Sequence, residues 1–153
     1  MMKYFKSIFY LIWVINILSF IPSAFAKKVL LINDTTNWYH WGCTGTSLAM
    51  KSYISGKGYE LTALPITETY KWLLAPLTTE GFKNKIIFKK FLEAYPELIQ
   101  KILSADIVVI NGEGTLHGLR TAPINLLYVA FISKFFLEKM FKLLTILFSL
   151  RMI

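Results

Sequence analysis

The chain has 153 residues, of which 55% are hydrophobic and 17% are charged. These values predict about one folded domain and exclude a disordered chain. The single cysteine, Cys43, excludes an internal disulfide and a multi-cysteine zinc site. The net charge is +8, but the basic residues neither form long runs nor alternate with aromatic residues, so no nucleic-acid partner is predicted.

Residues 1–26 have the three parts of a secretory signal peptide. Lysines precede an uncharged stretch with an apolar block at Ile8–Ile21, and Ala24 and Ala26 supply a small-residue cleavage site. We expect cleavage after Ala26 and a protein that is secreted or held in the cell envelope. The alternative is an uncleaved segment that anchors the protein in the membrane, with the domain at the cytoplasmic face.

Beyond this segment, short apolar runs alternate with polar loops and helical patterns. The first expected elements are a buried strand at Val29–Ile32, a loop at Asn33–Gly45 and a helix capped by Thr46 or Ser47 and ended by Gly56 and Gly58. A weaker strand at Tyr59–Leu64, a short helix at Tyr70–Leu74 and two helices between Lys83 and Leu103, divided at Pro96, follow. The last elements are a strand at Ile107–Ile110, a loop at Asn111–Gly118 and a helix from about Ala122 to Lys139. The order of strand, loop and helix therefore predicts an α/β fold with a Rossmann-like parallel sheet over residues 27–139.

The loop after the first strand combines hydroxyl, amide and imidazole side chains directly before a helix, at the sheet edge where such folds bind ligands. With the backbone N–H groups of that helix, the loop is suited to an anion. The sequence has neither a Walker loop nor a GxGxxG fingerprint, so no nucleotide cofactor is predicted. Trp38, Tyr39 and Trp41 either stack on a sugar ring or pack within the loop.

The loop at Asn111–Gly118 contains three glycines, which permit close backbone approach. Glu113 and His117 are suited to act as an acid–base pair, because a loop histidine titrates near neutrality and a carboxylate orients it. The alternative is a tight strand–helix connection, in which Glu113 caps backbone amides and His117 is solvated.

Cys43 and the two histidines are open to two explanations. Cys43 is a candidate nucleophile, because a helix N-terminus lowers the pKa of a thiol, or it is a small packing residue. His40 and His117 could ligate a metal with Asp34 or Glu113, but their spacing matches no metal-binding motif, so no metal is predicted.

Together the two loops resemble landmarks of the polysaccharide pyruvyl transferase family. The first landmark is Asn33–Thr35 followed by His40–Ser47, where a strand end leads to His-Trp-Gly-Cys-Thr-Gly-Thr-Ser. The second is Ala105–His117, a strand that starts after an aspartate and ends in Asn-Gly-Glu-Gly-Thr. The order and separation of the landmarks also agree, and the resemblance spans about residues 27–139.

The resemblance implies the N-terminal lobe of a glycosyltransferase-B-like fold, and transfer of a pyruvyl group from phosphoenolpyruvate to a sugar of a cell-surface polysaccharide or its precursor. It suggests catalytic roles for Glu113 and His117 and no cofactor. The substrate-binding residues expected from it are Asn33, Asp34, His40, Gly42, Thr44, Gly45, Thr46, Ser47, Asn111, Gly112, Gly114 and Thr115. In the family, the basic residues that bind the donor belong mainly to a second lobe, so we expect this chain to be truncated and inactive.

Residues 140–153 are predicted to form an aberrant apolar tail, because no turn signal follows Lys139 where a crossover should lead into a strand. Reading the back-translated sequence one base earlier restores a strand and a polar loop, so a broken reading frame near Lys139 is predicted. Two other functions stay open. One is a non-catalytic carbohydrate-binding protein of the envelope, and the other is a small membrane-associated protein.

Overall fold

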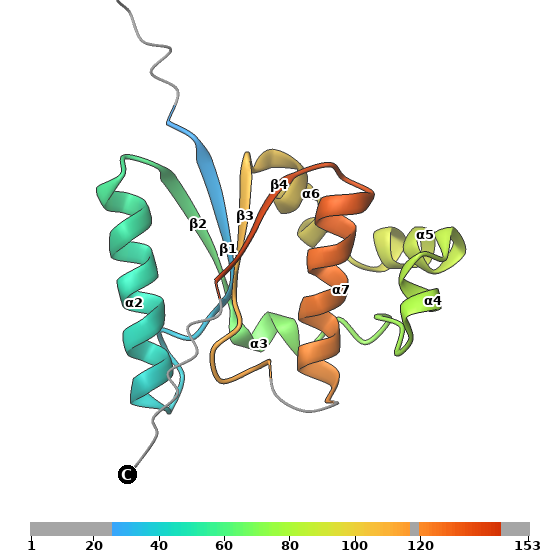
Figure 1. Cartoon of the computed structure of the whole chain (residues 1–153), viewed down its shortest axis with the longest axis horizontal. Coiled ribbons are helices and arrows are strands. Elements are labelled where there is room, and N and C mark those ends of the chain that lie inside the picture. Colours follow the sequence, from blue (N-terminus) through green and yellow to red (C-terminus); the bar gives the residue numbers. More distant parts are fainter. Residues whose placement is uncertain (1–25, 117–119, 145–153) are drawn as a thin grey trace, which may run out of the picture.

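The computed structural model describes residues 26–116 and 120–144, which form an α/β structure on a four-stranded parallel sheet (Figure 1). The strands are β1 (Lys28–Asp34), β2 (Glu60–Pro65), β3 (Ile107–Asn111) and β4 (Met140–Leu144), in the order β2-β1-β3-β4. β1 is central, since its Val29 lies opposite Leu61 of β2 and Ile107 of β3. Most of the expected signal peptide or anchor, residues 1–25, lies outside the described residues.

The helices that connect these strands begin and end at local sequence signals. They are α2 (Trp41–Gly56), α3 (Ile66–Thr69), α4 (Thr79–Phe82), α5 (Lys85–Ala94), α6 (Pro96–Ser104) and α7 (Thr121–Phe135). The Asn84 side chain accepts hydrogen bonds from the first N–H groups of α5. Pro96 occupies the first turn of α6, and Gly58, with a φ of 74°, follows the end of α2.

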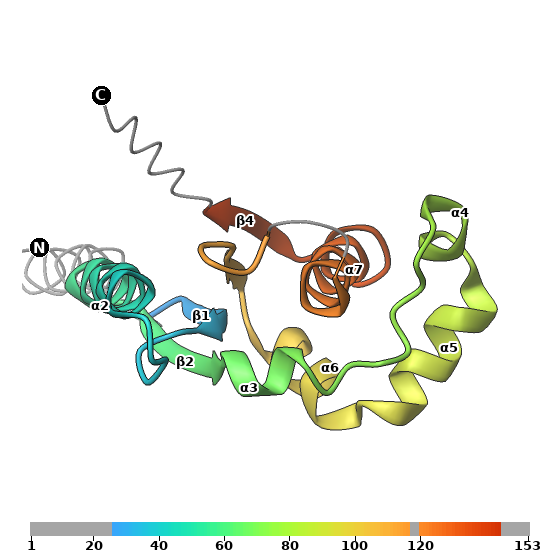
Figure 2. The same ribbon diagram turned by 90° about the horizontal axis from the view of Figure 1, so that it is seen from below.

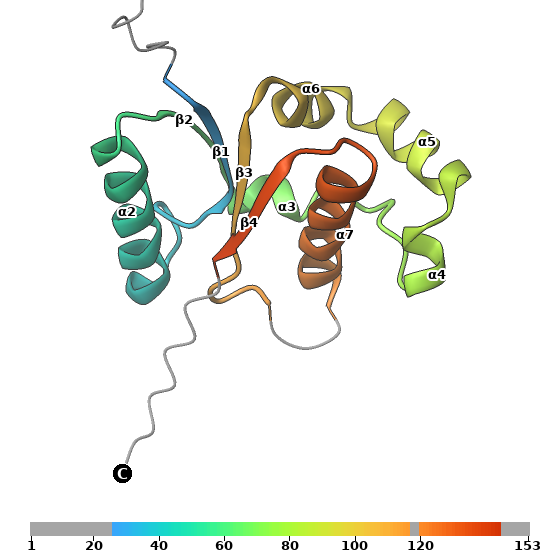
Figure 3. The same ribbon diagram turned by 45° about the horizontal axis from the view of Figure 1, so that its top comes forward.

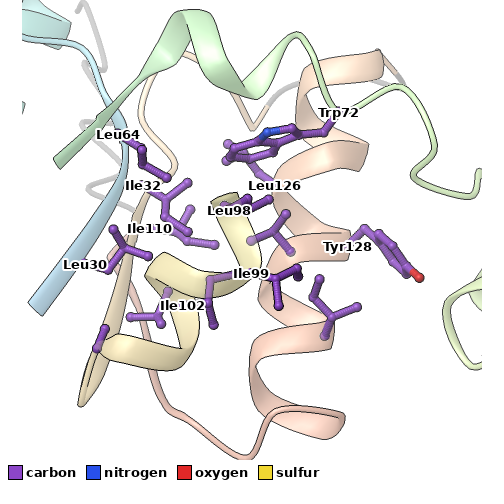
Figure 4. Close-up of a cluster of buried hydrophobic side chains, with 14 of the residues drawn as sticks. Leu30, Ile32, Leu64, Trp72, Leu98, Ile99, Ile102, Ile110, Leu126 and Tyr128 are labelled. Carbon is purple, nitrogen blue, oxygen red and sulfur yellow. The ribbon is translucent and has the colours of Figure 1, made fainter. Parts of the chain in front are cut away.

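Helices cover both faces of the sheet. α2 lies on one face, α6 and α7 on the other, and α4 and α5 lie on the far side from α2 (Figures 2 and 3). The side chains of β1 alternate accordingly, so that Leu30 and Ile32 join the larger core with Leu126 of α7, whereas Val29 and Leu31 pack with α2. Figure 4 shows the larger core between the strands and α7.

The connections that leave β1 and β3 run in opposite directions. From β1 the chain passes through α2 to β2, and from β3 it passes through α7 to β4 on the other side of the sheet. β1 and β3 are neighbours, so a topological switch point lies between them. In doubly wound sheets, ligands bind outside the carboxyl ends of the strands at such a point.

The expected parallel α/β sheet is confirmed, as is the division of two helices at Pro96. Two predicted helices lie elsewhere. α2 begins at Trp41, ahead of the predicted caps, and the short helix α3 directly follows Pro65 rather than spanning Tyr70–Leu74. Pro65 ends the strand β2, and the chain turns at once into α3.

Residues 140–144 form the strand β4, whereas an aberrant apolar tail was expected over residues 140–153. The rest of that expected tail, residues 145–153, lies outside the described residues. α7 ends at Phe135, and the chain turns through Glu138, which adopts a φ of 52°. The N–H group of Lys139 then donates to the carbonyl oxygen of Ser133 at 2.9 Å, and β4 pairs in parallel with β3. The turn escaped prediction because a glutamate, not a glycine, takes the positive φ. The broken reading frame stays a prediction.

Candidate functional site

The two loops that carry the resemblance meet at the carboxyl edge of the sheet. The first comprises residues 35–40 between β1 and α2, and the second follows Asn111 and is described as far as Leu116. The strands before them pair directly. Segments that are 78 residues apart, such as Asn33 and Asn111, therefore come into hydrogen-bonding contact.

Asn33 joins the two loops through its side chain. It is fully buried and has a φ of 68°, a left-handed conformation that asparagine adopts more often than most residues. Its Nδ2 donates to the carbonyl oxygen of Asn111 at 2.7 Å and to Oγ1 of Thr115 at 2.9 Å. Its Oδ1 accepts from Oγ1 of Thr69 at 3.2 Å. One side chain thus connects the end of β1, the loop after β3 and α3.

Asn111 forms a second set of buried hydrogen bonds. Its Nδ2 donates to Oγ of Ser47 at 3.0 Å and to Oγ1 of Thr35 at 3.3 Å, and its Oδ1 accepts from the N–H group of Glu113 at 3.0 Å. The hydroxyl of Thr35 in turn donates to the carbonyl oxygen of Cys43 at 2.6 Å. These bonds hold the first turns of α2 against the end of β3.

Four of the predicted substrate-binding residues therefore bond to one another. Asn33, Ser47, Asn111 and Thr115 are each at most 3% exposed. In this structure they fix the shape of the loops, and direct contact with a substrate stays a prediction for them. A satisfied buried polar network and a ligand site use the same residue types, so the sequence pattern alone does not separate the two.

The last part of the predicted loop Asn33–Gly45, from Trp41 onward, forms the beginning of α2. His40 is the N-cap residue, without a capping bond from its side chain. Thr46 lies inside the helix, where its hydroxyl donates to the carbonyl oxygen of Gly42 at 3.2 Å, so the predicted cap at Thr46 or Ser47 is wrong.

Several residues that were predicted to bind substrate or to act in catalysis are nevertheless accessible at this edge of the sheet. The exposed ones are His40, Gly45 and Gly114, and the half-buried ones are Asp34, Gly42, Thr44 and Glu113, whereas Thr46 and Gly112 are buried. The accessible residues come from both loops and from the start of α2.

Asp34, at the end of β1, carries a charge that two neighbours hold in place. Its Oδ2 lies 2.8 Å from Nζ of Lys51, and its Oδ1 accepts from the N–H group of Thr36 at 3.0 Å. Burial acts to raise the pKa of the Asp34 carboxyl, but the hydrogen bonds from Lys51 and Thr36 outweigh burial, so the pKa lies below its ordinary value of 3.8. Asp34 is therefore ionised at neutral pH and paired, which suits it to shaping the loop.

Cys43, in the first turn of α2, lies against the loop that carries Glu113. A Cβ atom on Gly114 would lie 2.6 Å from Sγ of Cys43, and Gly114 has a φ of 67°, so only glycine fits there. Burial, and then the carboxylate of Glu113, raise the pKa of the Cys43 thiol. A backbone hydrogen bond lowers this pKa, but the other two effects outweigh it, so the thiol is not activated as expected and packing is the explanation that the structure favours for Cys43.

Glu113 has one buried oxygen, Oε2, without a hydrogen-bond partner among the described residues. Its predicted partner His117 lies outside the described residues, so the acid–base pair stays a prediction. Sγ of Cys43 and Nδ1 of His40 are 3.9 Å apart. Within residues 26–116 and 120–144 no group of three or more metal-ligating side chains is placed to hold a metal ion.

The aromatic residues of the first loop are exposed rather than packed in a core. Tyr39 and Trp41 are 86% and 87% exposed. Trp38 contacts Tyr39 and also stacks on Tyr70, with a distance of 6.2 Å between the ring centroids. Trp38, Tyr39 and Tyr70 therefore form an aromatic surface beside the switch point, and of these three residues Tyr70 was not predicted.

Sequence reasoning also missed Lys51, Thr69 and Asn125. The Asn125 side chain, inside α7, donates to the carbonyl oxygen of Thr69 at 2.6 Å and so ties α7 to α3. An asparagine in an otherwise apolar helix was the available signal, because a helix interior disfavours asparagine unless it has a partner. Lys51 carried no signal, since exposed lysines are common on helices.

Comparison with protein-family models, with curated proteins and with solved structures gave no match to this chain. The family resemblance therefore rests on the residues of the two loops. Among the described residues, no helix is both long and apolar enough to cross a membrane.

Proposed function

We propose that this chain is the sugar-acceptor lobe of a polysaccharide pyruvyl transferase-like protein with a glycosyltransferase-B-like fold. One observation carries the proposal: the two loops that resemble the family, far apart in the sequence, join at the switch point through the bonds of Asn33 to Asn111 and Thr115. If the two loops resembled the family only by chance, they could lie at separate places in the fold.

The reaction joins two hydroxyl oxygens of a sugar to one carbon of pyruvate as a ketal. Phosphoenolpyruvate loses its phosphate, its methylene carbon gains one proton, and the two sugar hydroxyls lose one proton each. One of these protons balances the new methyl group and the other leaves with the phosphate. The reaction therefore needs a group that accepts a proton from a hydroxyl at the acceptor side.

Glu113 is the described residue best suited to that task. It lies on the loop that follows β3, its backbone N–H group is fixed by Asn111, and Oε2 has no partner among the described residues. Its loop reaches the surface at Gly114. Oε2 itself is buried, whereas Glu113 as a residue is half-buried, so a sugar hydroxyl would bond to the accessible part of this carboxylate.

Binding of saccharides to the full chain tests the proposal. We expect fragments of a cell-surface polysaccharide to bind, and Glu113→Gln to weaken binding about tenfold, the effect of losing a hydrogen bond to a charged group. The free energy of unfolding should change by less than about 1 kcal/mol. Glu60→Gln is the matched control, because Glu60 is exposed at the start of β2, at the opposite edge of the sheet. Absence of saccharide binding, or equal effects of the two variants, contradicts the proposal.

A second candidate function is carbohydrate binding without catalysis. The exposure of Tyr39 and Trp41 favours it, because aromatic rings offer sugars a flat apolar surface. Here Trp41→Ala should abolish binding of the same fragments, and Glu113→Gln should leave it unchanged. The opposite result favours the acceptor lobe.

A further inference from the structure

A pocket of about 220 Å³ opens beside the aromatic surface. It is lined by Tyr70, by Gly114 and Thr115 of the loop after β3, and by Arg120 and the first residues of α7. The pocket thus lies next to the loop that carries Glu113. Its volume is below the range of about 300–1,000 Å³ of pockets for drug-sized ligands, so it suits a small group or a single ring.

The charge at this pocket is positive. Arg120 is exposed and makes no ion pair with any described residue. The first turn of α7 has neither an acidic residue nor a capping side chain. The N–H groups of Thr121 and Ala122 therefore add to the positive charge, whereas Pro123 has no N–H group. None of the described residues that line the pocket carries a carboxylate. The pocket therefore favours an anionic group, because arginine binds carboxylates and phosphates with two parallel hydrogen bonds.

Tyr70 gives the same pocket an aromatic wall. The side chain is 47% exposed, and its ring stacks on Trp38 with 20° between the two planes. The contact with Trp38 therefore holds the Tyr70 ring in position, while the ring stays accessible to solvent. A pocket that is lined by both an aromatic ring and an arginine can hold a ring that carries an acidic group.

We infer that this pocket binds an anionic sugar, whose ring lies against Tyr70 and whose carboxylate or phosphate meets Arg120 and the N-terminus of α7. The inference rests on the proposed function and makes it specific, since it states that the acceptor carries a negative charge. It assigns to Tyr70 and Arg120 a binding role that the family resemblance did not include.

The test is titration of the full chain with glucuronic acid, glucose 1-phosphate, glucose and inorganic phosphate, followed by tryptophan fluorescence, since Trp38 touches Tyr70. We expect the two anionic sugars to bind at least about tenfold more tightly than glucose or inorganic phosphate. Arg120→Gln should reduce their affinity to that of glucose, Tyr70→Ala should weaken it, and Tyr70→Phe should retain it. Lys134→Gln, at the exposed far end of α7, is the control and should change nothing.

The other outcomes overturn the inference in distinct ways. If glucose binds as tightly as the charged sugars and Arg120→Gln has no effect, the acceptor is neutral and the proposed function remains. If inorganic phosphate binds as tightly as glucose 1-phosphate and Tyr70→Ala has no effect, the pocket is an anion site without a sugar. If none of the sugars and none of the polysaccharide fragments bind, the inference and the proposed function both fall.

Discussion

Asn33 holds the loops of the site together from a backbone conformation that few residues adopt. Its φ of 68° disfavours a side chain with a Cβ atom, and its amide makes three buried hydrogen bonds. Both properties belong to asparagine, which tolerates the left-handed region and both donates and accepts. The residue is therefore fixed by two independent requirements.

Asn33→Ala should lower the free energy of unfolding by about 3 kcal/mol, because it leaves buried partners unpaired and keeps the strained φ. Asn33→Gly loses the same bonds without the strain, so it should cost about 1 kcal/mol less. Chemical denaturation of both variants measures the difference. Equal losses would show that the backbone conformation contributes nothing.

The ion pair of Asp34 predicts a pH dependence. The pKa of Asp34 is lower in the folded than in the unfolded chain, so the unfolded chain takes up the proton first as the pH falls. The contribution to stability is complete above the ordinary pKa of 3.8 and is lost as the pH falls further. Lys51→Met should therefore lower the free energy of unfolding at neutral pH. The difference in free energy of unfolding between this variant and the unchanged chain should become smaller below about pH 4.

Urea denaturation at several pH values provides the measurement. Lys89→Met is the control, because Lys89 belongs to an exposed pair with Glu93 at 4.0 Å, and such pairs contribute little. A difference for Lys51→Met that stays constant down to pH 3 would contradict the ion pair.

At the scale of single residues, the sequence identified which positions are unusual but not what they do. Asn33, Asn111 and Gly114 were singled out, and each has a special role in the structure. The burial of Asn33 and Asn111 and the close approach of Gly114 to Cys43 depend on the pairing of β1 with β3, which no local pattern contains. Tyr70 and Arg120 were missed for the same reason, since only the fold brings them to one pocket.

At the scale of elements, the contact between the loop after β3 and the start of α2 is tight enough to test. Gly114→Ala should cost about 2 kcal/mol, because its Cβ would collide with Sγ of Cys43 and its φ is positive. Cys43→Ala removes that sulfur. The double variant should therefore be more stable than the sum of the two single changes predicts, by at least about 1 kcal/mol.

The coupling is measured by denaturing the two single variants and the double variant. Gly45→Ala is the control, because a Cβ atom there meets nothing within 4 Å. Strictly additive effects of Gly114→Ala and Cys43→Ala would mean that the two segments do not touch.

Strands were predicted more accurately than helix ends. The runs Val29–Ile32 and Ile107–Ile110 are apolar and β-branched, and the structure places both within strands. The start of α2 was missed because His40 caps it without a side-chain bond. β4 was missed because a residue other than glycine makes its turn. Element ends depend on single backbone angles, whereas strand cores depend on several residues in a row.

At the scale of the whole molecule, cleavage after Ala26 stays a prediction, and it would leave all of β1 in the mature chain. Ala26, Lys27 and Lys28 are exposed, and β1 starts at Lys28. We expect the protein recovered from cells to begin at Lys27. We also expect it to unfold on heating in a cooperative transition, since it keeps all of β1. Mass spectrometry of the intact protein decides this, and a mature chain that still begins at Met1 or Met2 contradicts cleavage.

The sheet order has a consequence for synthesis. The central strand β1 emerges first from the ribosome, but one of its neighbours comes much later, as the bond from the N–H group of Lys28 to Asp106, 78 residues further along, illustrates. Until β3 has been translated, the apolar run Val29–Ile32 lacks one flanking strand. Pairing over such distances slows folding. We therefore expect the nascent chain to stay unfolded for longer than a helical protein of this size would, with the apolar run Val29–Ile32 open to other chains along one side until β3 pairs with it.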